Sequence, residues 1–404
     1  MFDFLKDRNK KIQFVNSYLI FFINGLLALS IGAILPYIRD ERGLDYVFCG
    51  MILSLHSIGN LASSFAGGIL PTFIGRKRSI LLFNAFFALA YIFIIAFDNR
   101  LMIAAAFFMT GLARGATSNF CNALVNSLAP GKAWIINCLH AMFSVGAFLF
   151  PIILVVITMQ NPDNWIIVCY FMAIMGAISW ILYLMMPRED IKKQSENEDN
   201  ASEPQRGLKF LREPLFYLCT GVLFFYLCAE QGVIGWLITY FKDTGLMSAS
   251  LSQVMASVLW IAILAGRLTV AFLSTKINKG KMLILMGVGL VLFFFLLLFS
   301  KNPVMIVIGI LGFGFSMSGI YPTTVSFAGI LLERYAFVWS FILTTASLGS
   351  IVMPTIIGRI AEGLGIFYGM SAIVAVVFID MILIVKLVQY TRKQEVIEKV
   401  RGAA

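Results

Sequence analysis

Long apolar runs, each the length of a membrane-spanning helix, fill the chain between short polar segments. A bilayer core takes about 20 apolar residues per helical span. No stretch shows the ten-residue alternation of polarity that strands of a membrane barrel require. The pattern therefore predicts an all-α membrane protein. Its twelve predicted transmembrane helices cover 14–38, 46–72, 79–97, 101–129, 134–158, 165–186, 215–241, 248–273, 282–299, 304–331, 336–358 and 366–389.

One charged interruption, Pro187–Pro214, divides these spans into two sets of six. Its 28 residues hold 13 charged side chains, whereas apolar runs fill most of the sequence on either side. We predict a six-helix bundle over 1–186, a cytoplasmic linker over 187–214, and a second six-helix bundle over 215–404 that ends in a short cytoplasmic tail. A short surface helix is predicted within the linker, at 208–211.

Composition excludes a water-soluble fold, because 60% of the 404 residues are hydrophobic, 13% are charged and the mean hydropathy is +0.89. The six cysteines fall in or beside apolar spans, at spacings that suit neither a disulfide framework nor a zinc site. We predict that they pack as small core residues. No metal and no cofactor is expected.

Basic residues predict the topology. With both termini and the linker placed in the cytoplasm, 23 lysines and arginines lie on the cytoplasmic side and 6 on the outer side, as the positive-inside rule requires. The charged head before the first span lacks a small-residue cleavage site, so no removable signal peptide is expected. The net charge of +10 then reflects topology and contact with anionic lipid, and predicts no nucleic-acid partner.

The two halves repeat each other at an offset of 203 residues. A basic turn after the second span, 68–78, matches a basic turn after the eighth, 275–281. Five further positions match at the same offset: Gly32 with Gly235, Tyr37 with Tyr240, Gly111 with Gly314, Gly146 with Gly349, and Pro151 with Pro354. A single shared offset predicts two parallel repeats, which in transporters are related by an axis along the membrane normal.

The basic turn after the second span resembles the Gly-x-x-x-Asp-Arg-x-Gly-Arg-Lys motif of the major facilitator superfamily. Gly68, Gly75, Arg76 and Lys77 match that motif, whereas Thr72 stands where aspartate is usual. The resemblance implies two pseudo-symmetric six-helix bundles and a role for the four matching residues in conformational change.

A finer resemblance, to the fucose-permease-like sugar symporter group, rests on patterns in four spans. In that group the fourth span carries an acidic residue where this chain has Ser118. The resemblance implies sugar transport and a central cavity lined by the first, fourth, seventh and tenth spans. The patterns are His140 to Pro151, Glu230 to Tyr240, Gly314 to Thr323, and Ser347 to Pro354.

Charged residues inside spans are functional candidates, because a charge at membrane depth costs several kcal/mol unless it is paired or hydrated. Arg114 shares one helix face with Ser118 and Asn122, at steps of four. We predict that this face borders a water-filled cavity. Arg114 there either holds a carboxylate, a phosphate or a pair of sugar hydroxyls of the substrate, or is bound to backbone carbonyls and serves packing.

Glu230 lies near the middle of the seventh span, beside Gln231. The resemblance places it across the cavity from Arg114. We predict that it pairs with Arg114 in one conformation and binds a proton or substrate in another; a purely structural ion pair is the alternative. Arg267 and Asp380 are interpreted as packing or gating charges.

Further polar and aromatic side chains complete the predicted site. Both histidines are candidate proton relays, because imidazole titrates near neutrality, and His140 is the better candidate. The alternative for each, favoured for His56, is a hydrogen-bonded buried histidine. Asn24, Tyr321, Trp236 and Trp260 are predicted to contact substrate, the two tryptophans by stacking on a sugar face.

These features favour a secondary active transporter of a small polar solute, a sugar or sugar-like metabolite, that works by alternating access with proton coupling. The alternative is an organic-anion transporter or a drug and metabolite efflux antiporter of the same fold. An enzyme is disfavoured, because no catalytic cluster is present. The expected partners are the solute, a proton or other coupling ion, and the lipid bilayer of the cell membrane, with the protein a monomer. Substrate identity, direction and coupling ion stay open.

Overall fold

The computed structural model describes residues 7–130, 132–187, 208–273, 276–335 and 337–402. The prediction of twelve membrane-spanning helices is confirmed. They comprise α1 (Arg8–Arg42), α2 (Tyr46–Ile74), α3 (Arg76–Ala96), α4 (Arg100–Leu128), α5 (Ala133–Thr158), α6 (Trp165–Met185), α7 (Pro214–Asp243), α8 (Ala249–Leu273), α9 (Lys279–Phe299), α10 (Pro303–Met317), α11 (Ile320–Arg334), α12 (Val338–Leu364) and α13 (Ile366–Gly402). Helices α10 and α11 together make the tenth span, Pro303–Leu332.

The 203-residue repeat extends to the helix ends. Helix α9 begins and ends 203 residues after α3, and α8 begins 203 residues after α2. The caps repeat as well: the Asn99 side chain accepts from Leu101 N at the start of α4, and Asn302 accepts from Val304 N at the start of α10. A capping side chain satisfies a backbone N–H that has no partner within the helix. The same local chemistry therefore starts equivalent helices in both repeats.

The chain forms two compact units whose boundaries do not follow the repeat. Unit 1 contains Met1–Asp190, Ile234–Trp260 and Gly358–Ile366. Unit 2 contains Ile191–Val233, Ile261–Ile357 and Phe367–Ala404. The predicted division into two six-helix bundles stays a prediction, because most of the linker lies outside the described residues.

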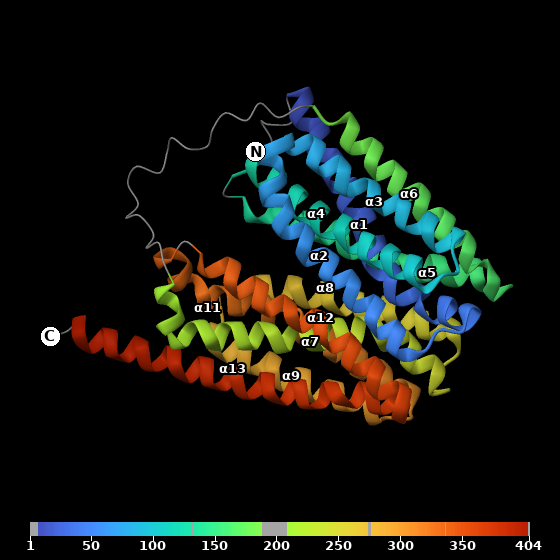
Figure 1. The fold of residues 1–404 in the computed structure, drawn as a ribbon. Coiled ribbons are helices and arrows are strands. Elements are labelled where there is room, and N and C mark those ends of the chain that lie inside the picture. Colours follow the sequence, from blue (N-terminus) through green and yellow to red (C-terminus); the bar gives the residue numbers. More distant parts are fainter. Residues whose placement is uncertain (1–6, 131, 188–207, 274–275, 336, 403–404) are drawn as a thin grey trace. The chain divides into compact units, whose positions relative to one another are not determined.

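Close backbone contact between α2 and α4 organises unit 1 (Figure 1). A Cβ added at Gly111 would collide with the carbonyl oxygen of His56, and one at Gly59 would collide with that of Phe108. Small residues at a membrane helix interface let two backbones approach closely. The register of α2 on α4 is therefore determined by these glycines, and it brings His56 beside the polar face of α4.

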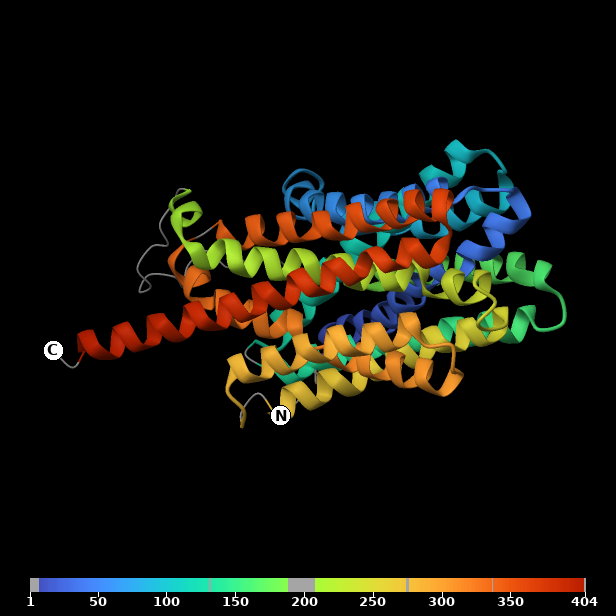
Figure 2. The ribbon, with the colours of Figure 1, turned by 90° about the horizontal axis from the view of Figure 1, so that it is seen from below.

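In unit 2, α13 is a long and nearly straight helix (Figure 2). Its buried positions include Ile373, Val377, Asp380, Ile384 and Leu387, which recur every three or four residues. This spacing places them on one face of a helix. Asp380 thus occupies a position in the middle of an otherwise apolar buried face.

The predicted conformational motif forms the turn between α2 and α3. Gly75 has a φ of 83° and ends α2, a backbone conformation that favours glycine. Lys77 donates to the carbonyl oxygens of Leu184 and Met186 at 2.7 and 2.6 Å, and so binds the end of α6. The Arg76 guanidinium lies over the Phe120 ring at 4.8 Å. This turn borders a cavity of about 300 Å³ that Gly68, Ser64 and Asn119 help to line.

The short surface helix predicted in the linker at 208–211 is observed as a 3₁₀ turn, Lys209–Arg212. Its Phe210 side chain is fully buried, with its ring against those of Phe216, Tyr335 and Phe341. The rest of the predicted linker, 188–207, lies outside the described residues.

Candidate functional site

Arg114, near the middle of α4, contacts the imidazole of His56 on α2. Arg114 Nη1 lies 3.3 Å from His56 Nε2, and His56 Nδ1 lies 2.8 Å from the Thr110 hydroxyl. His56 is almost completely buried, whereas Arg114 is only partly so. The sequence singled out Arg114 and predicted a hydrogen-bonded buried histidine at His56, as observed, but it did not predict the contact between the two.

The second half of the α4 polar face joins three helices. Asn24 Nδ2 on α1 donates to the Ser118 hydroxyl at 3.0 Å. Asn122 Nδ2 donates to the Ser118 carbonyl oxygen at 2.8 Å, and its Oδ1 lies 3.0 Å from His140 Nε2 on α5. Because the amide oxygen accepts, His140 Nε2 carries the hydrogen. Four of the predicted site residues thus form one hydrogen-bonded chain.

Six buried side-chain polar atoms of unit 1 have no hydrogen-bond partner among the described residues, and Asn24 Oδ1 and Trp260 Nε1 are two of them. The other four are Arg42 Nε, Asn84 Oδ1, Thr239 Oγ1 and Gln253 Oε1. Leaving a buried polar group unpaired costs about 1–3 kcal/mol, so each such group calls for an explanation. Phe143 packs against Trp260 and against Gly25, the residue that follows Asn24 on α1. A Cβ on Gly25, next to Asn24, would collide with the Phe143 carbonyl oxygen, and the Phe143 and Trp260 ring centroids are 5.6 Å apart.

The two tryptophans predicted to stack on a sugar have different environments. Trp260 packs against Phe143 with the two ring planes tilted by 59°, and its indole N–H is unpaired among the described residues. Trp236 has a fully buried side chain, and its ring centroid lies 6.0 Å from that of Tyr46. Of the two, Trp260 is the better placed to bind a solute.

Unit 2 brings together the other predicted residues around a tyrosine that sequence reasoning missed. The Tyr226 hydroxyl donates to Glu230 Oε1 at 2.9 Å, and the Tyr226 and Tyr321 ring centroids are 6.1 Å apart. Gln231 Nε2 lies 3.4 Å from Glu230 Oε2. Arg267 lies within electrostatic range of Tyr226. The signal for Tyr226 was available, since it is one helical turn before Glu230.

The predicted pairing of Arg114 with Glu230 stays a prediction, because Arg114 belongs to unit 1 and Glu230 to unit 2. Asp380 differs from both. Its side chain is fully buried, and neither carboxyl oxygen has a hydrogen-bond partner among the described residues. The thiol of Cys228 on α7 lies within electrostatic range of this carboxyl group.

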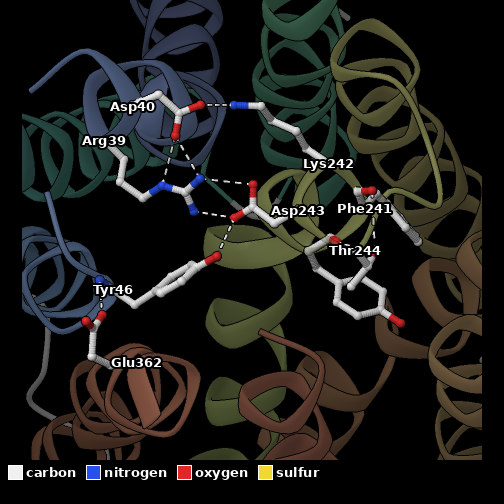
Figure 3. A network of polar contacts seen from close by, with 9 residues as sticks. Arg39, Asp40, Tyr46, Phe241, Lys242, Asp243, Thr244 and Glu362 are labelled. Carbon is white, nitrogen blue, oxygen red and sulfur yellow. Dashed lines mark hydrogen bonds and ion pairs between the residues drawn. The ribbon is translucent and has the colours of Figure 1, made fainter. Parts of the chain in front are cut away.

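A charged cluster that was not predicted from the sequence lies at the C-terminal ends of α1 and α7 (Figure 3). Arg39 pairs with both Asp243 and Asp40, and Lys242 pairs with Asp40. The Tyr46 hydroxyl donates to Asp243 Oδ2 at 2.7 Å. We refer to Arg39, Asp40, Tyr46, Lys242, Asp243 and Glu362 as the Arg39 network; Glu362 accepts from the backbone N–H of Tyr46 at 2.8 Å.

Four residues of the Arg39 network follow the 203-residue repeat. Arg39-Asp40 of α1 corresponds to Lys242-Asp243 of α7, and each basic residue pairs with the acidic residue of the other copy. Arg39 and Asp243 are 14% and 12% exposed, whereas Asp40 is 47% exposed. The Arg39–Asp243 pair is therefore the better shielded of the two. The offset that identified the repeat would have identified this cluster.

Comparison with known proteins identifies the family. Residues 17–354 match the Major Facilitator Superfamily. The chain belongs to the Major Facilitator Superfamily. It is therefore a multi-pass membrane transporter and not an enzyme, and the resemblance inferred from its basic turn is confirmed.

Relatives of this superfamily member are distant in sequence. The glucose/mannose transporter GlcP of Bacillus subtilis (strain 168) is 22% identical over 372 residues, which cover 88% of this chain and 91% of GlcP. A mutant of the nucleoside transporter NupG has the same fold, with a TM-score of 0.75 and 13% identity over 93% of this chain and 98% of that one. A D-xylose-proton symporter gives a TM-score of 0.72 and 11% identity, covering 93% and 96%.

Proposed function

We propose that this transporter is a secondary active transporter that moves a sugar or sugar-like solute across the cell membrane by alternating access, with both termini in the cytoplasm. The observation that carries the proposal is a pair of buried polar groups, on α1 and α8, that have no hydrogen-bond partner among the described residues. Asn24 Oδ1 is an acceptor and Trp260 Nε1 a donor. A solute hydroxyl both donates and accepts, so a hydroxyl-rich neutral solute can satisfy both groups.

The surroundings of these two groups also suit a sugar. The Trp260 ring offers an apolar face for stacking, and the chain of Asn24, Ser118, Asn122 and His140 presents amides, a hydroxyl and an imidazole without a carboxylate. Arg114 adds a planar set of donors that can bind two neighbouring hydroxyls. The similarity to a glucose/mannose transporter supports the same class of solute.

In the proposed cycle the Arg39 network joins the outer ends of the helices while the site is open to the cytoplasm, and it separates when the site opens outward. Glu230, hydrogen-bonded to Tyr226, is the proposed proton-coupling carboxylate. The proposal further takes the protein to be a monomer in the bilayer.

Thermal unfolding of the purified protein with a panel of ligands tests the substrate class. A ligand at 100 times its Kd stabilises the folded state by about 2.7 kcal/mol. We expect glucose, mannose or xylose to raise the Tm, and lactate, malate or phosphate not to. A response to carboxylates alone would refute sugar transport and favour the organic-anion alternative, with Arg114 as the anion-binding residue.

Uptake into proteoliposomes tests the site. Trp260→Phe keeps an aromatic ring, although a smaller one, and removes the indole N–H, so we expect KM to rise about tenfold, which corresponds to about 1.4 kcal/mol. Trp180→Phe is the matched control, because the Trp180 N–H donates to the Leu81 carbonyl oxygen at 3.0 Å, away from the site. Equal KM values for the two variants would contradict the site.

A further inference from the structure

His56 contacts Arg114 through a short chain of hydrogen bonds whose direction can be determined. The Thr110 hydroxyl donates its one hydrogen to the Phe107 carbonyl oxygen at 2.6 Å. Toward His56 Nδ1, 2.8 Å away, the same hydroxyl can therefore only accept. His56 Nδ1 must then carry the hydrogen.

A neutral imidazole with its hydrogen on Nδ1 has an acceptor at Nε2. Arg114 Nη1 lies 3.3 Å from this atom and can only donate. Each donor thus meets an acceptor in all three bonds: Arg114 donates to His56, His56 to Thr110, and Thr110 to the Phe107 carbonyl oxygen. If Nε2 also took up a proton, the acceptor would be lost and the imidazole would become a second cation against the guanidinium. This arrangement therefore disfavours a proton-carrying role for His56.

Packing holds the imidazole in place. His56 is 4% exposed, and its backbone carbonyl oxygen lies where a side chain on Gly111 would be. A Cβ on Gly115 would likewise collide with the Asn60 carbonyl oxygen, one turn further along α2. Because α2 and α4 touch along their backbones, His56 cannot move relative to Arg114 without separating the two helices.

We infer that His56 is a positioning residue: as the neutral Nδ1–H tautomer set by Thr110, it orients the Arg114 guanidinium toward the solute. The inference rests on the proposed role of Arg114 in binding the sugar. Replacing a residue that fixes the orientation of a ligand-binding side chain typically lowers affinity by about tenfold or more.

Two substitutions of His56 separate its two contacts. In His56→Gln the amide reaches the place of Nε2 and its oxygen can accept from Arg114, but the contact with Thr110 is lost. In His56→Asn the shorter amide occupies the place of Nδ1 and can donate to Thr110, but it does not reach Arg114. For glucose uptake into proteoliposomes we expect KM near the wild-type value for His56→Gln and about tenfold higher for His56→Asn, with kcat little changed in both.

Thr110 provides an independent pair of variants that leaves His56 intact. Thr110→Ser keeps the hydroxyl and should keep KM, whereas Thr110→Val removes the acceptor that sets the tautomer and should raise KM several-fold. Thermal unfolding of all four variants checks that they fold. Because a packing role would affect both members of each pair alike, equal KM values within both pairs would overturn the inference.

Arg114→Lys distinguishes failure of this inference from failure of the proposed function. We expect this variant to raise KM at least as much as His56→Asn does. An unchanged KM would overturn the role of Arg114 in binding, and with it that of His56. A raised KM in Arg114→Lys together with equal KM values for His56→Gln and His56→Asn would overturn only the positioning role.

Discussion

The Arg39–Asp243 pair should control how readily the Arg39 network opens. Asp243 accepts from Arg39 Nη2 at 3.0 Å and from the Tyr46 hydroxyl at 2.7 Å, and it is 12% exposed. Asp243→Asn keeps the shape and the bond to Tyr46 but removes the charge. Breaking a buried ion pair completely costs roughly 3–5 kcal/mol. Because Arg39 keeps Asp40 as a partner, the stabilisation lost from the network in Asp243→Asn should be smaller than this.

We expect Asp243→Asn to favour opening of the network by about 2 kcal/mol, which is roughly 30-fold in population. Asp40→Asn is the matched control within the same network. Asp40 is 47% exposed, and exposed ion pairs contribute about 0.2–1 kcal/mol. Asp40→Asn should therefore change the population of the open network by less than about fivefold.

Cys49 provides a native reporter for this measurement. It is fully buried on α2, one turn after Tyr46, and within electrostatic range of Arg39 and Asp243. A membrane-impermeant maleimide added to cells should label Cys49 faster in Asp243→Asn than in Asp40→Asn or the wild type. Cys49→Ala should abolish the signal, and Cys138→Ser removes the exposed cysteine from the background. Equal labelling of Asp243→Asn and wild type, or of the two variants, would refute the reasoning.

Three further predictions concern packing, and each is tested by thermal unfolding in detergent. Gly111→Ala forces α2 and α4 apart and should lower the free energy of unfolding by about 1–3 kcal/mol. In the control Gly67→Ala the added Cβ meets nothing within 4 Å, so the free energy of unfolding should rise by up to about 1 kcal/mol. Equal Tm values for the two variants would contradict the close contact. Lys77→Met removes two bonds to the end of α6 and should lower the Tm, and no change would exclude that role. Asp380→Val should raise the Tm by removing an unpaired buried carboxyl, so a lower Tm would show that Asp380 has a partner.

The helices could be predicted from the sequence because each membrane span is a long run of apolar residues. The tenth span is the exception in detail, since it is divided into α10 and α11 near Gly319, where a Cβ would collide with the Met286 side chain. That contact depends on the packing of α9 against its neighbours, which no local pattern reveals.

Site residues on one helix were also predictable, whereas partners from other helices were not. Steps of four placed Arg114, Ser118 and Asn122 on one face of α4. The contact of Arg114 with His56 depends on the register between α2 and α4, which backbone contacts at Gly59 and Gly111 determine. In the sequence, Arg39 and Lys242 look like topology charges at span ends. Only the offset of 203 residues between Arg39-Asp40 and Lys242-Asp243 distinguishes these four residues.

The crossed pairing of Arg39-Asp40 with Lys242-Asp243 has a consequence for how such a protein could arise. A basic residue followed by an acidic one is complementary to a second copy of itself when the two copies meet across a two-fold axis. Duplication of a single six-helix segment would supply both sides of this contact in one event, without a compensating mutation. Tyr46 and Glu362 have no such counterpart, since 203 residues separate them from Ala249 and Met159. At these two positions the sequences of the two copies differ.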